Sequence, residues 1–184
     1  MESMKDDIKG VLFTEQQLAE CVKDMGARIT KDYEGVDNLL LVTVLKGAAV
    51  FFTDLMRCID LPLSIDFMAA SSYGADIKTS GVVKIVKDLD TPLEGRNVLI
   101  VEDILDSGVT LNYLKNIFLD RNPASIKIAT LFDKPERHKV ELKPDYIGLE
   151  VPDEFIVGYG LDYNEKYRNL PYVGILKPEV YQTR

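Results

Sequence analysis

Side chains suited to chemistry gather in one short stretch, VEDILDSGVT, at residues 101–110. Its acids Glu102 and Asp103 are adjacent, and carboxylates accept hydrogen bonds from the neighbouring hydroxyls of a sugar diol with little directional restriction. The turn that follows, DSGVT at residues 106–110, contains a glycine and two hydroxyl side chains. Backbone N–H groups of such a turn at a helix start form an anion nest, to which the hydroxyls add hydrogen bonds. Two carboxylates that can bind a sugar diol, followed by a turn that can bind phosphate, indicate a site for a ribose 5-phosphate.

A simpler interpretation of this stretch is also open. The DSG sequence could be a plain helix N-cap and the two acids could be solvated, as in most isolated acidic turns. The ligand site is favoured because an apolar strand, an acid pair, a turn and a helix occur together in this order. The stretch is not the phosphate loop of nucleoside triphosphatases, because it lacks the Gly-Lys-Ser/Thr sequence of that motif.

Composition limits the class of protein. A chain of 184 residues can bury a continuous core as one domain, residues 1–184, without disulfides or metals. Hydrophobic residues make up 46% and charged residues 28%, which is far from the composition of disordered chains. The formal charge of −8 opposes binding to nucleic acid phosphates or to an anionic membrane. A polyphosphate substrate would therefore have to arrive with divalent cations or meet local basic residues, and Mg²⁺ is the expected cofactor.

Other residue types exclude further classes. Cys21 and Cys58 have no motif spacing, so neither a disulfide framework nor a structural zinc site is expected. His138, the one histidine, lies in the charged run PERHKVE and is expected to be a solvated loop residue, which leaves a Ser-His-Asp hydrolase without support. The N-terminus lacks the apolar region of a signal peptide and no run approaches the length of a membrane span, so a cytoplasmic protein is expected.

Apolar patterns outline the elements that must position these residues. Thr14 and Gln17 form a capping-box pattern, which predicts a helix start. The apolar face of this helix is expected to contain Leu18, Val22, Met25 and Ile29. The run LLLVTVL at residues 39–45 is typical of a parallel strand buried on both faces. A turn at Lys46-Gly47 and a second helix follow, with apolar residues Ala48, Phe51, Phe52 and Leu55.

The middle of the chain alternates strands and helices. Leu63, Ile65 and Phe67 alternate with Ser64 and Asp66, which predicts a strand. The polar segment 69–81 is too long for a tight hairpin and is expected to be a mobile loop before a strand over 82–86. Further strands are predicted over 98–101 and 126–132. Between them, a helix is expected to bury Leu111, Leu114, Ile117 and Phe118.

This alternation predicts an α/β fold with a parallel sheet, whose functional groups should lie at the carboxyl ends of the strands. Four turns fulfil that condition, near Lys46, Ala70, Glu102 and Asp133. Short runs at 146–149, 155–159 and 172–176 make the C-terminal third richer in strands, and they could form a small cap.

The stretch VEDILDSGVTL resembles the phosphoribosyl diphosphate motif of the hypoxanthine-guanine phosphoribosyltransferases. The likeness runs from about Val11 to Tyr181 and includes LKGA at residues 45–48, SSYG at 71–74, DKP at 133–135 and PDEFIVGYGLDYNEKYRNLPYVG. The resemblance implies a type I phosphoribosyltransferase fold, in which a central, mostly parallel sheet is flanked by helices and a small β-rich hood is formed largely by the C-terminal third. One departure is Val109, where some relatives carry a basic residue, so no cationic side-chain contact to phosphate is expected from this position, although backbone contacts would remain.

The resemblance also implies a reaction and its partners. The family transfers the 5-phosphoribosyl group from phosphoribosyl diphosphate to N9 of hypoxanthine or guanine, which releases pyrophosphate and gives IMP or GMP for purine salvage. It implies magnesium as cofactor, small-molecule substrates, no nucleic acid or membrane partner, and a homodimer or homotetramer. A xanthine-preferring relative is one alternative. Another is a non-catalytic sensor of phosphoribosyl diphosphate that regulates a nucleic acid partner, but the acidic balance and the lack of an appended DNA-binding segment oppose it.

Site residues carry over from the family by position. Asp106 is expected to be the general base. Phosphoribosyl diphosphate and nucleotide are expected to contact Lys46, Gly47, Ser72, Tyr73, Glu102, Asp103, Ile104, Leu105, Asp106, Ser107, Gly108, Val109, Thr110 and Arg168. The purine is expected to contact Lys134, Phe155, Ile156 and Asp162. The metal ligands are expected to be Glu102, Asp103 and Asp162.

The resemblance gives some of these residues specific roles. The Lys46-Gly47 turn binds pyrophosphate through its backbone and often holds a non-proline cis peptide in the family, and Arg168 is a pyrophosphate ligand. Ser72 and Tyr73 belong to a lid that excludes water. Lys134 contacts the purine 6-oxo group and Phe155 stacks on the purine. Without the resemblance, a generic turn would be as good an interpretation of Lys46-Gly47 as a binding site, and Ser72 and Tyr73 could belong to an ordinary flexible loop. Arg168 could form a surface ion pair, Lys134 could be a solvated turn residue, and Phe155 and Ile156 could be β-core residues.

Overall fold

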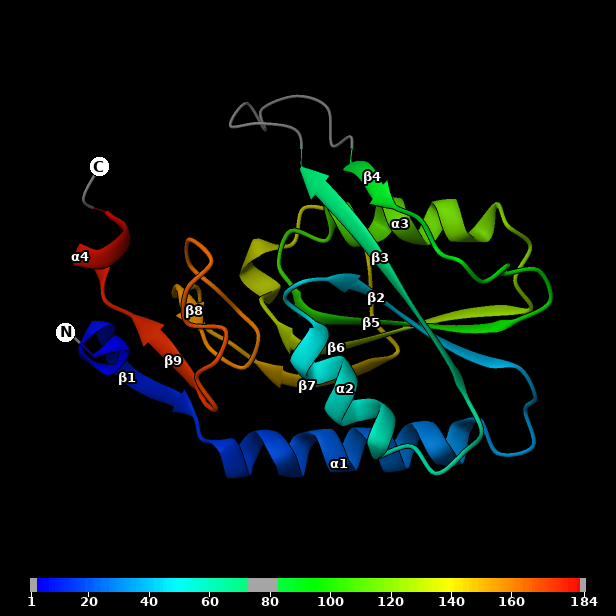
Figure 1. The fold of residues 1–184 in the computed structure, drawn as a ribbon, viewed down its shortest axis with the longest axis horizontal. Helices are drawn as coiled ribbons and strands as arrows, with labels where there is room; N and C mark the ends of the chain where they lie inside the picture. Colours follow the sequence, from blue (N-terminus) through cyan, green and yellow to red (C-terminus); the bar gives the residue numbers. More distant parts are fainter. Residues whose placement is uncertain (1–2, 73–82, 183–184) are drawn as a thin grey trace.

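A computed structural model of the chain describes residues 3–72 and 83–182. Its main sheet has six strands in the order β4-β3-β2-β5-β6-β7 (Figure 1). Their bounds are β2 (Leu39–Leu45), β3 (Ser64–Ser72), β4 (Val83–Lys87), β5 (Asn97–Leu105), β6 (Ser125–Asp133) and β7 (Tyr146–Glu150). All neighbours pair in parallel except β4, which is antiparallel to β3. The expected α/β architecture with a central, mostly parallel sheet is confirmed.

Helices cover both faces of this sheet (Figure 1). They are α1 (Glu15–Asp32) and α2 (Ala49–Arg57) on one face and α3 (Val109–Leu119) on the other. The short α4 (Pro178–Tyr181) lies away from this sheet (Figure 1), and the 3₁₀ turns are η1 (Met4–Asp7) and η2 (Pro135–Arg137). One core lies between the sheet and the pair α1 and α2, and a second core lies between the sheet and α3. The predicted apolar faces of α1 and α2 are buried, as are those of α3 except for the partly buried Ile117.

The start of α1 agrees with the capping-box prediction. Thr14 Oγ1 accepts from Gln17 N at 3.3 Å, and Gln17 Oε1 accepts from Thr14 N at 2.9 Å. Two backbone donors that the helix leaves unpaired are thereby satisfied.

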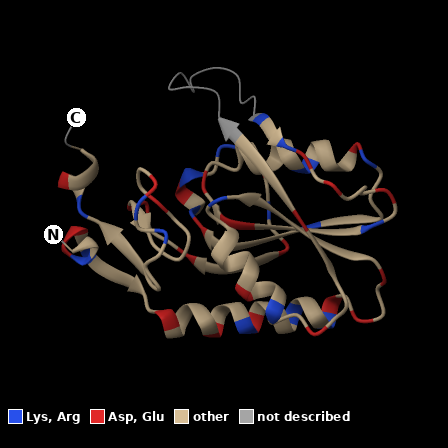
Figure 2. Ribbon diagram, in the orientation of Figure 1, with Lys and Arg blue, Asp and Glu red and all other residues tan. Residues whose placement is uncertain are grey.

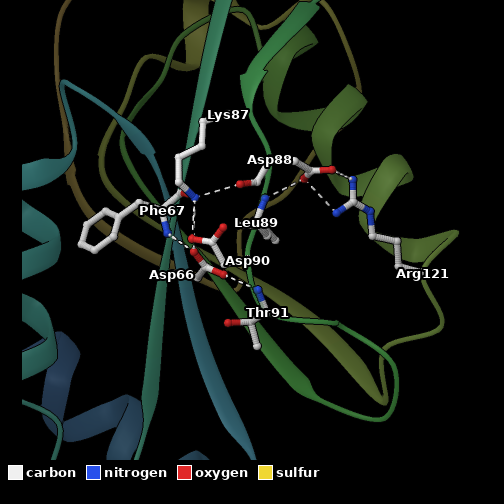
Figure 3. A network of polar contacts seen from close by, with 8 residues as sticks. All are labelled: Asp66, Phe67, Lys87, Asp88, Leu89, Asp90, Thr91 and Arg121. Carbon is white, nitrogen blue, oxygen red and sulfur yellow. Dashed lines mark hydrogen bonds and ion pairs between the residues drawn. The ribbon is translucent and has the colours of Figure 1, made fainter.

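The predicted alternation in β3 is wrong in one respect. Ile65 is 40% exposed, whereas the intervening Asp66 is only 6% exposed. The Asp66 carboxylate accepts from Phe67 N and from Thr91 N, both at 2.7 Å (Figure 3). Burial alone would raise the pKa of Asp66, but these hydrogen bonds and the charge of Lys87 lower it below its ordinary value. A buried polar anchor therefore replaces an apolar contact here and fastens the chain after β4 to the sheet.

A second polar contact extends this anchor to α3. Arg121, just beyond the end of α3, donates from Nη1 and Nη2 to the two carboxylate oxygens of Asp88, each at 2.9 Å (Figure 3). Bidentate pairs of this kind fix the relative orientation of the two side chains. The edge strand β4 is thus tied to α3, the helix that follows residues 106–110, which are called the phosphate turn below after their predicted role.

The strand β5 is longer than its apolar run predicts. It continues through both acids to Leu105 because β6 pairs with it there, with Glu102 opposite Thr130 and Leu105 opposite Asp133. Successive strand residues point to opposite faces. Glu102 therefore lines a pocket on the α3 side, while Asp103 lies beside Leu161 and Asp162 on the other side.

A smaller antiparallel sheet combines the two ends of the chain. It has the order β1-β9-β8, with β1 (Ile8–Phe13), β9 (Val173–Leu176) and β8 (Ile156–Val157). The sequence placed the run at 146–149 with this cap, but β7 instead pairs in parallel with β6 at the edge of the main sheet. The N-terminal strand β1 supplies the third strand, a long-range pairing that local periodicity does not reveal.

Candidate active site

The candidate site lies between β2 and β5, the two neighbouring strands from which the chain continues toward opposite edges of the main sheet. From β2 the chain continues to β3 on one side, whereas from β5 it continues to β6 on the other side. Parallel sheets bind ligands at the carboxyl ends of strands at such a switch point. The Lys46-Gly47 turn follows β2, and Lys134 follows β6. Glu102 and Asp103 lie near the end of β5, and the phosphate turn follows that strand. Ser72 ends β3, with its side chain outside the described part, and Tyr73 lies outside the described residues altogether.

The phosphate turn lines a pocket of about 260 Å³. Gly108 is the N-cap of α3 and has a φ of +76°, a conformation that favours glycine. A β-carbon at this position would also lie only 2.9 Å from the Val140 side chain. The first turn of α3 leaves backbone N–H groups without an acceptor inside the helix, and the N–H of Val109 donates to Ser107 Oγ at 3.4 Å. The predicted residues in this pocket are Glu102, Ile104, Leu105, Asp106, Ser107, Gly108 and Thr110. The arrangement can hold a phosphate monoester.

A second pocket of about 220 Å³ adjoins the first. Its lining contains the four residues expected to contact the purine, which are Lys134, Phe155, Ile156 and Asp162. It also contains Asp103 and Leu161. Ile104 and Asp106 line both pockets, so the two hollows meet at the end of β5. A flat heterocycle in the second pocket and a sugar phosphate in the first would therefore meet near Asp106.

Lys134 points toward the second pocket from the end of β6. Its Nζ donates to the backbone carbonyl of Glu154 at 2.8 Å, and its side chain is partly buried. Burial lowers the pKa of the Lys134 ammonium, while the charges of Asp106 and Asp153 raise it. The group has three donors, so it can serve a ligand carbonyl in addition to Glu154. The alternative of a fully solvated turn residue does not fit this environment.

Phe155 is 36% exposed, and an aromatic cluster holds its ring. Tyr181 of α4 stacks on it with ring centroids 4.9 Å apart and planes 26° apart. Tyr163 meets it edge-on, at 5.4 Å and 88°. The neighbouring Ile156 is 6% exposed and begins β8. One ring face of Phe155 is thus packed against the C-terminal helix, and the residue also borders the second pocket.

The Lys46-Gly47 turn packs closely against both β5 and the chain after β8. The peptide bond between Leu45 and Lys46 is cis. A β-carbon on Gly47 would collide with Asp103 Oδ2, and one on Gly160, whose φ is +100°, would collide with the Gly47 carbonyl. Only glycine fits at these two positions without a shift of its neighbours.

Arg168 stands next to this turn. Its Nη1 donates to the Gly160 carbonyl at 2.9 Å, and its Nη2 pairs with Asp162 at 2.9 Å. Its Nε is buried and has no hydrogen-bond partner among the described residues. Lys46 pairs with Glu165 at 3.1 Å across the same junction. A cation is therefore held beside the Gly47 backbone, where an anionic group could bind.

Burial strongly affects the two acids of β5. It raises the pKa of the Glu102 carboxyl well above its usual range, and the charge of Asp103 raises it further. Burial also raises the pKa of Asp103 to about 6, although backbone hydrogen bonds and the charge of Arg168 oppose this. Glu102 Oε1 is buried and lacks a hydrogen-bond partner among the described residues. Both carboxylates would thus gain from a cation or from hydroxyl donors.

The three expected metal ligands do not form one cage. Glu102 lines the first pocket, whereas Asp103 and Asp162 line the second. Within residues 3–72 and 83–182, no group of three or more His, Cys, Asp or Glu side chains is arranged to hold a metal ion. Oxygen donors and an unpartnered carboxylate oxygen nevertheless fit Mg²⁺, which commonly binds through one or two carboxylates, water and substrate phosphates.

The structure adds one residue that the sequence did not single out. Arg137 of η2 donates from Nε to Asp106 Oδ1 at 2.9 Å and pairs with Asp153 at 3.5 Å. Its position three residues after Lys134, in a turn that begins with a proline, was a usable signal, since such a turn brings both side chains to the same strand end.

His138 is not the solvated loop residue that the sequence predicts. Its Nε2 lies 2.6 Å from Oδ1 of Asp133, a carboxylate that is 8% exposed. The error arose because Asp133 ends β6 inside the sheet, and a buried carboxylate needs a partner. The histidine therefore helps to fix the turn after β6.

No helix within the described residues is long and apolar enough to cross a membrane. Residues 12–164 match the family model described as the phosphoribosyl transferase domain. The chain is 54% identical over 180 residues to a hypoxanthine-guanine phosphoribosyltransferase of Bacillus subtilis, covering 98% of this chain and 99% of the relative. A crystal structure of a hypoxanthine phosphoribosyltransferase from Staphylococcus aureus superimposes with a TM-score of 0.94 at 50% identity, covering 98% of each chain. A hypoxanthine phosphoribosyltransferase from Trypanosoma cruzi, solved as a ternary substrates complex, has a TM-score of 0.91 at 39% identity, covering 96% of this chain and 99% of that one.

Proposed function

The chain belongs to the phosphoribosyltransferase family, in its hypoxanthine-guanine branch, and from this premise we propose that it transfers the 5-phosphoribosyl group of phosphoribosyl diphosphate to hypoxanthine or guanine. The bond between the anomeric carbon and the pyrophosphate oxygen breaks, and a bond from that carbon to purine N9 forms. Pyrophosphate leaves with the bonding electron pair, and the purine gives up one proton. The products are IMP or GMP and pyrophosphate, and the role is purine salvage.

The observation that carries this proposal is the meeting of two pockets at Asp106. One pocket has the features of a phosphate cradle, and the other has a lysine, an aromatic ring and a strand edge suited to a flat base. A reaction between an anomeric carbon and a ring nitrogen needs both ligands side by side, since alignment of the reacting atoms accounts for much of the rate.

The first pocket would bind the 5-phosphate. The N–H groups at the start of α3 and the hydroxyls of Ser107 and Thr110 would donate to its oxygens. The carboxylates of Glu102 and Asp103 would accept from the ribose hydroxyls, either directly or with a bound cation. Val109 offers only its backbone N–H, so this cradle would hold phosphate without a cationic side chain from that position.

The second pocket would bind the purine. Phe155 would stack on the ring, the backbone of Ile156 would read its edge, and Lys134 would donate to the 6-oxo group. Asp106 borders both pockets and would take the proton that the purine ring loses.

The leaving pyrophosphate would lie against the Lys46-Gly47 turn and Arg168. The backbone of Gly47 and the guanidinium of Arg168 would neutralise the charge that develops as the sugar acquires oxocarbenium character. Magnesium, held by Asp103, Asp162 or Glu102 together with the substrate phosphates, would supply further positive charge when bound.

Partners follow from the same site. We propose small-molecule substrates only, a homodimer or homotetramer on family grounds, and a cytoplasmic location. Figure 2 shows basic residues interspersed with acidic ones around the fold, which offers little attraction to nucleic acid phosphates. Sedimentation of the purified protein tests the assembly.

A panel of bases tests the proposed function. Purified protein is incubated with phosphoribosyl diphosphate, Mg²⁺ and hypoxanthine, guanine, xanthine or adenine in turn, and the nucleotides are separated by chromatography. Turnover of hypoxanthine or guanine supports the proposal. Preferential turnover of xanthine would reassign the substrate, and binding of phosphoribosyl diphosphate without turnover of any base would indicate a sensor.

A further inference from the structure

We propose that Arg137 is a positioning residue of the reaction, which holds the Asp106 carboxylate in place at the junction of the two pockets. This inference rests on the proposed function, because it assigns Arg137 a task through Asp106 and not through direct contact with a substrate.

The side-chain geometry is specific. Arg137 Nε donates to Asp106 Oδ1 at 2.9 Å, and Nη1 lies 3.5 Å from Asp153 Oδ1. Two carboxylates from different parts of the chain thus fix one planar guanidinium, whose donors have a rigid arrangement. Among the described residues, Arg137 is the only hydrogen-bond donor to the Asp106 carboxylate, and it uses Oδ1. Oδ2 is left to accept a proton from a ligand.

The backbone keeps this pair in register. Lys134 N donates to the Leu105 carbonyl, and Lys139 N donates to the Ser107 carbonyl, each at 2.9 Å. The segment 134–139 is therefore fastened to the phosphate turn on both sides of Asp106, and Arg137 extends from the middle of this segment. Such a frame reduces the freedom of the ion pair, which distinguishes it from an isolated pair on a surface.

The charge of Arg137 matters as well as its shape, because a hydrogen bond between two charged groups is stronger than one between neutral groups and holds the carboxylate more firmly. Asp106 also faces charges of both signs from the neighbouring elements. They are Glu102, Asp103, Asp162 and Lys134, which line the same pockets, and Asp153, which pairs with the same Arg137. Because most of these are acidic, removal of Arg137 would leave the Asp106 carboxylate in a mainly negative environment.

The test compares Arg137→Gln and Arg137→Lys with the native protein. Values of kcat and of KM for phosphoribosyl diphosphate are measured at saturating Mg²⁺. We expect Arg137→Gln to lower kcat about tenfold with little change in this KM, because the substrate contacts remain while the Asp106 carboxylate loses its fixed orientation. Arg137→Lys keeps a cation beside Asp106 and should recover part of kcat.

Glu136→Gln is the matched control, because Glu136 neighbours Arg137 in η2 and is exposed. It should keep the native kcat and KM. An Arg137→Gln protein with the native kcat overturns the inference. A loss of kcat that Arg137→Lys does not partly recover, or a loss that appears mainly as a raised KM, overturns it as well, since a merely structural role would give either result. Arg137 is half exposed, so the variant should fold, and thermal melting checks this.

Two parallel measurements separate the possible failures. If the native protein makes no nucleotide, the proposed function is wrong. If it does, but Asp106→Asn is equally active, the role of Asp106 is wrong and the inference about Arg137 falls with it. Only a native enzyme that depends on Asp106 and not on the charge of Arg137 contradicts the inference alone.

Discussion

Asp103 Oδ2 occupies the space in which a β-carbon on Gly47 would lie. The turn after β2 and the acid at the end of β5 are therefore packed so closely that the residue at position 47 and the orientation of the Asp103 carboxylate depend on each other. This contact links the proposed pyrophosphate turn to a proposed metal ligand across the switch point of the sheet.

We predict that Gly47→Ala impairs catalysis more than folding. The added methyl group would displace the Asp103 carboxylate, which accepts from Ile104 N at 2.7 Å, and an error of about 1 Å in a site can lower the rate roughly 100-fold. The measurement is kcat/KM for phosphoribosyl diphosphate, with thermal melting alongside. Gly10→Ala is the control, since a β-carbon there meets nothing within 4 Å. Equal activity of the two variants would refute the link.

Asp106→Asn should leave binding of phosphoribosyl diphosphate nearly intact and lower kcat about 10²- to 10⁴-fold, as loss of a general base does. An amide keeps the size of the side chain and its contact with Arg137 through the remaining oxygen, but it cannot accept the purine proton. Steady-state kinetics and calorimetric titration with phosphoribosyl diphosphate separate the two effects. A kcat near the native value would remove Asp106 from this role.

Lys134→Ala should reduce the preference for hypoxanthine over adenine. The ammonium donates and cannot accept, so it suits a 6-oxo group and opposes a 6-amino group. A site built around such a contact can reject the wrong analogue by about 10⁴-fold when several contacts fail together. The ratio of kcat/KM for the two bases is measured in both proteins. An unchanged ratio means that Lys134 does not read the 6-position.

The buried anchor at Asp66 predicts a stability that depends on pH. Its carboxyl has a pKa below the ordinary value of 3.8, so its contribution is present above that pH and is lost as the pH falls through the lower, folded-state pKa. Asp66→Asn would point an amide donor at Thr91 N or Phe67 N, and should destabilise the protein by about 1 to 3 kcal/mol at pH 7.

Urea unfolding at pH 7 and near pH 3 measures this effect, and the difference between native and variant should shrink at the lower pH. Asp90→Asn provides the control, since Asp90 pairs with the same Lys87 from a side chain that is 84% exposed. A similar loss for both variants at pH 7 would show that burial at Asp66 adds nothing.

Local pattern was sufficient to predict much of the fold. The bounds of β2 agree with its apolar run, and the Thr14 capping box begins α1 as expected, because both signals are contained in the segment itself. The turn from Asp106 to Thr110 also leads into α3 as predicted. Most residues assigned to the site line the two adjoining pockets. They lie close together because the carboxyl ends of parallel strands meet at the same edge of the sheet.

The features that escaped prediction depend on distant partners. The burial of Asp66 requires Thr91, and the extension of β5 requires pairing with β6. The small antiparallel sheet includes a strand from the N-terminus, and the environment of His138 depends on the buried end of β6. Arg137 contacts Asp106 because the fold places η2 beside the phosphate turn. Residue type and spacing alone do not specify any of these neighbours.

The most direct test of the central proposal is the stoichiometry of the reaction catalysed by the native protein. Hypoxanthine and phosphoribosyl diphosphate are incubated with the enzyme, and IMP and pyrophosphate are quantified together, with Mg²⁺ and with excess chelator. We predict equimolar IMP and pyrophosphate in the presence of Mg²⁺ and neither product with the chelator, because the metal neutralises the leaving group. Pyrophosphate without IMP would indicate hydrolysis and contradict the proposed transfer, and full turnover in chelator would contradict the role of the metal.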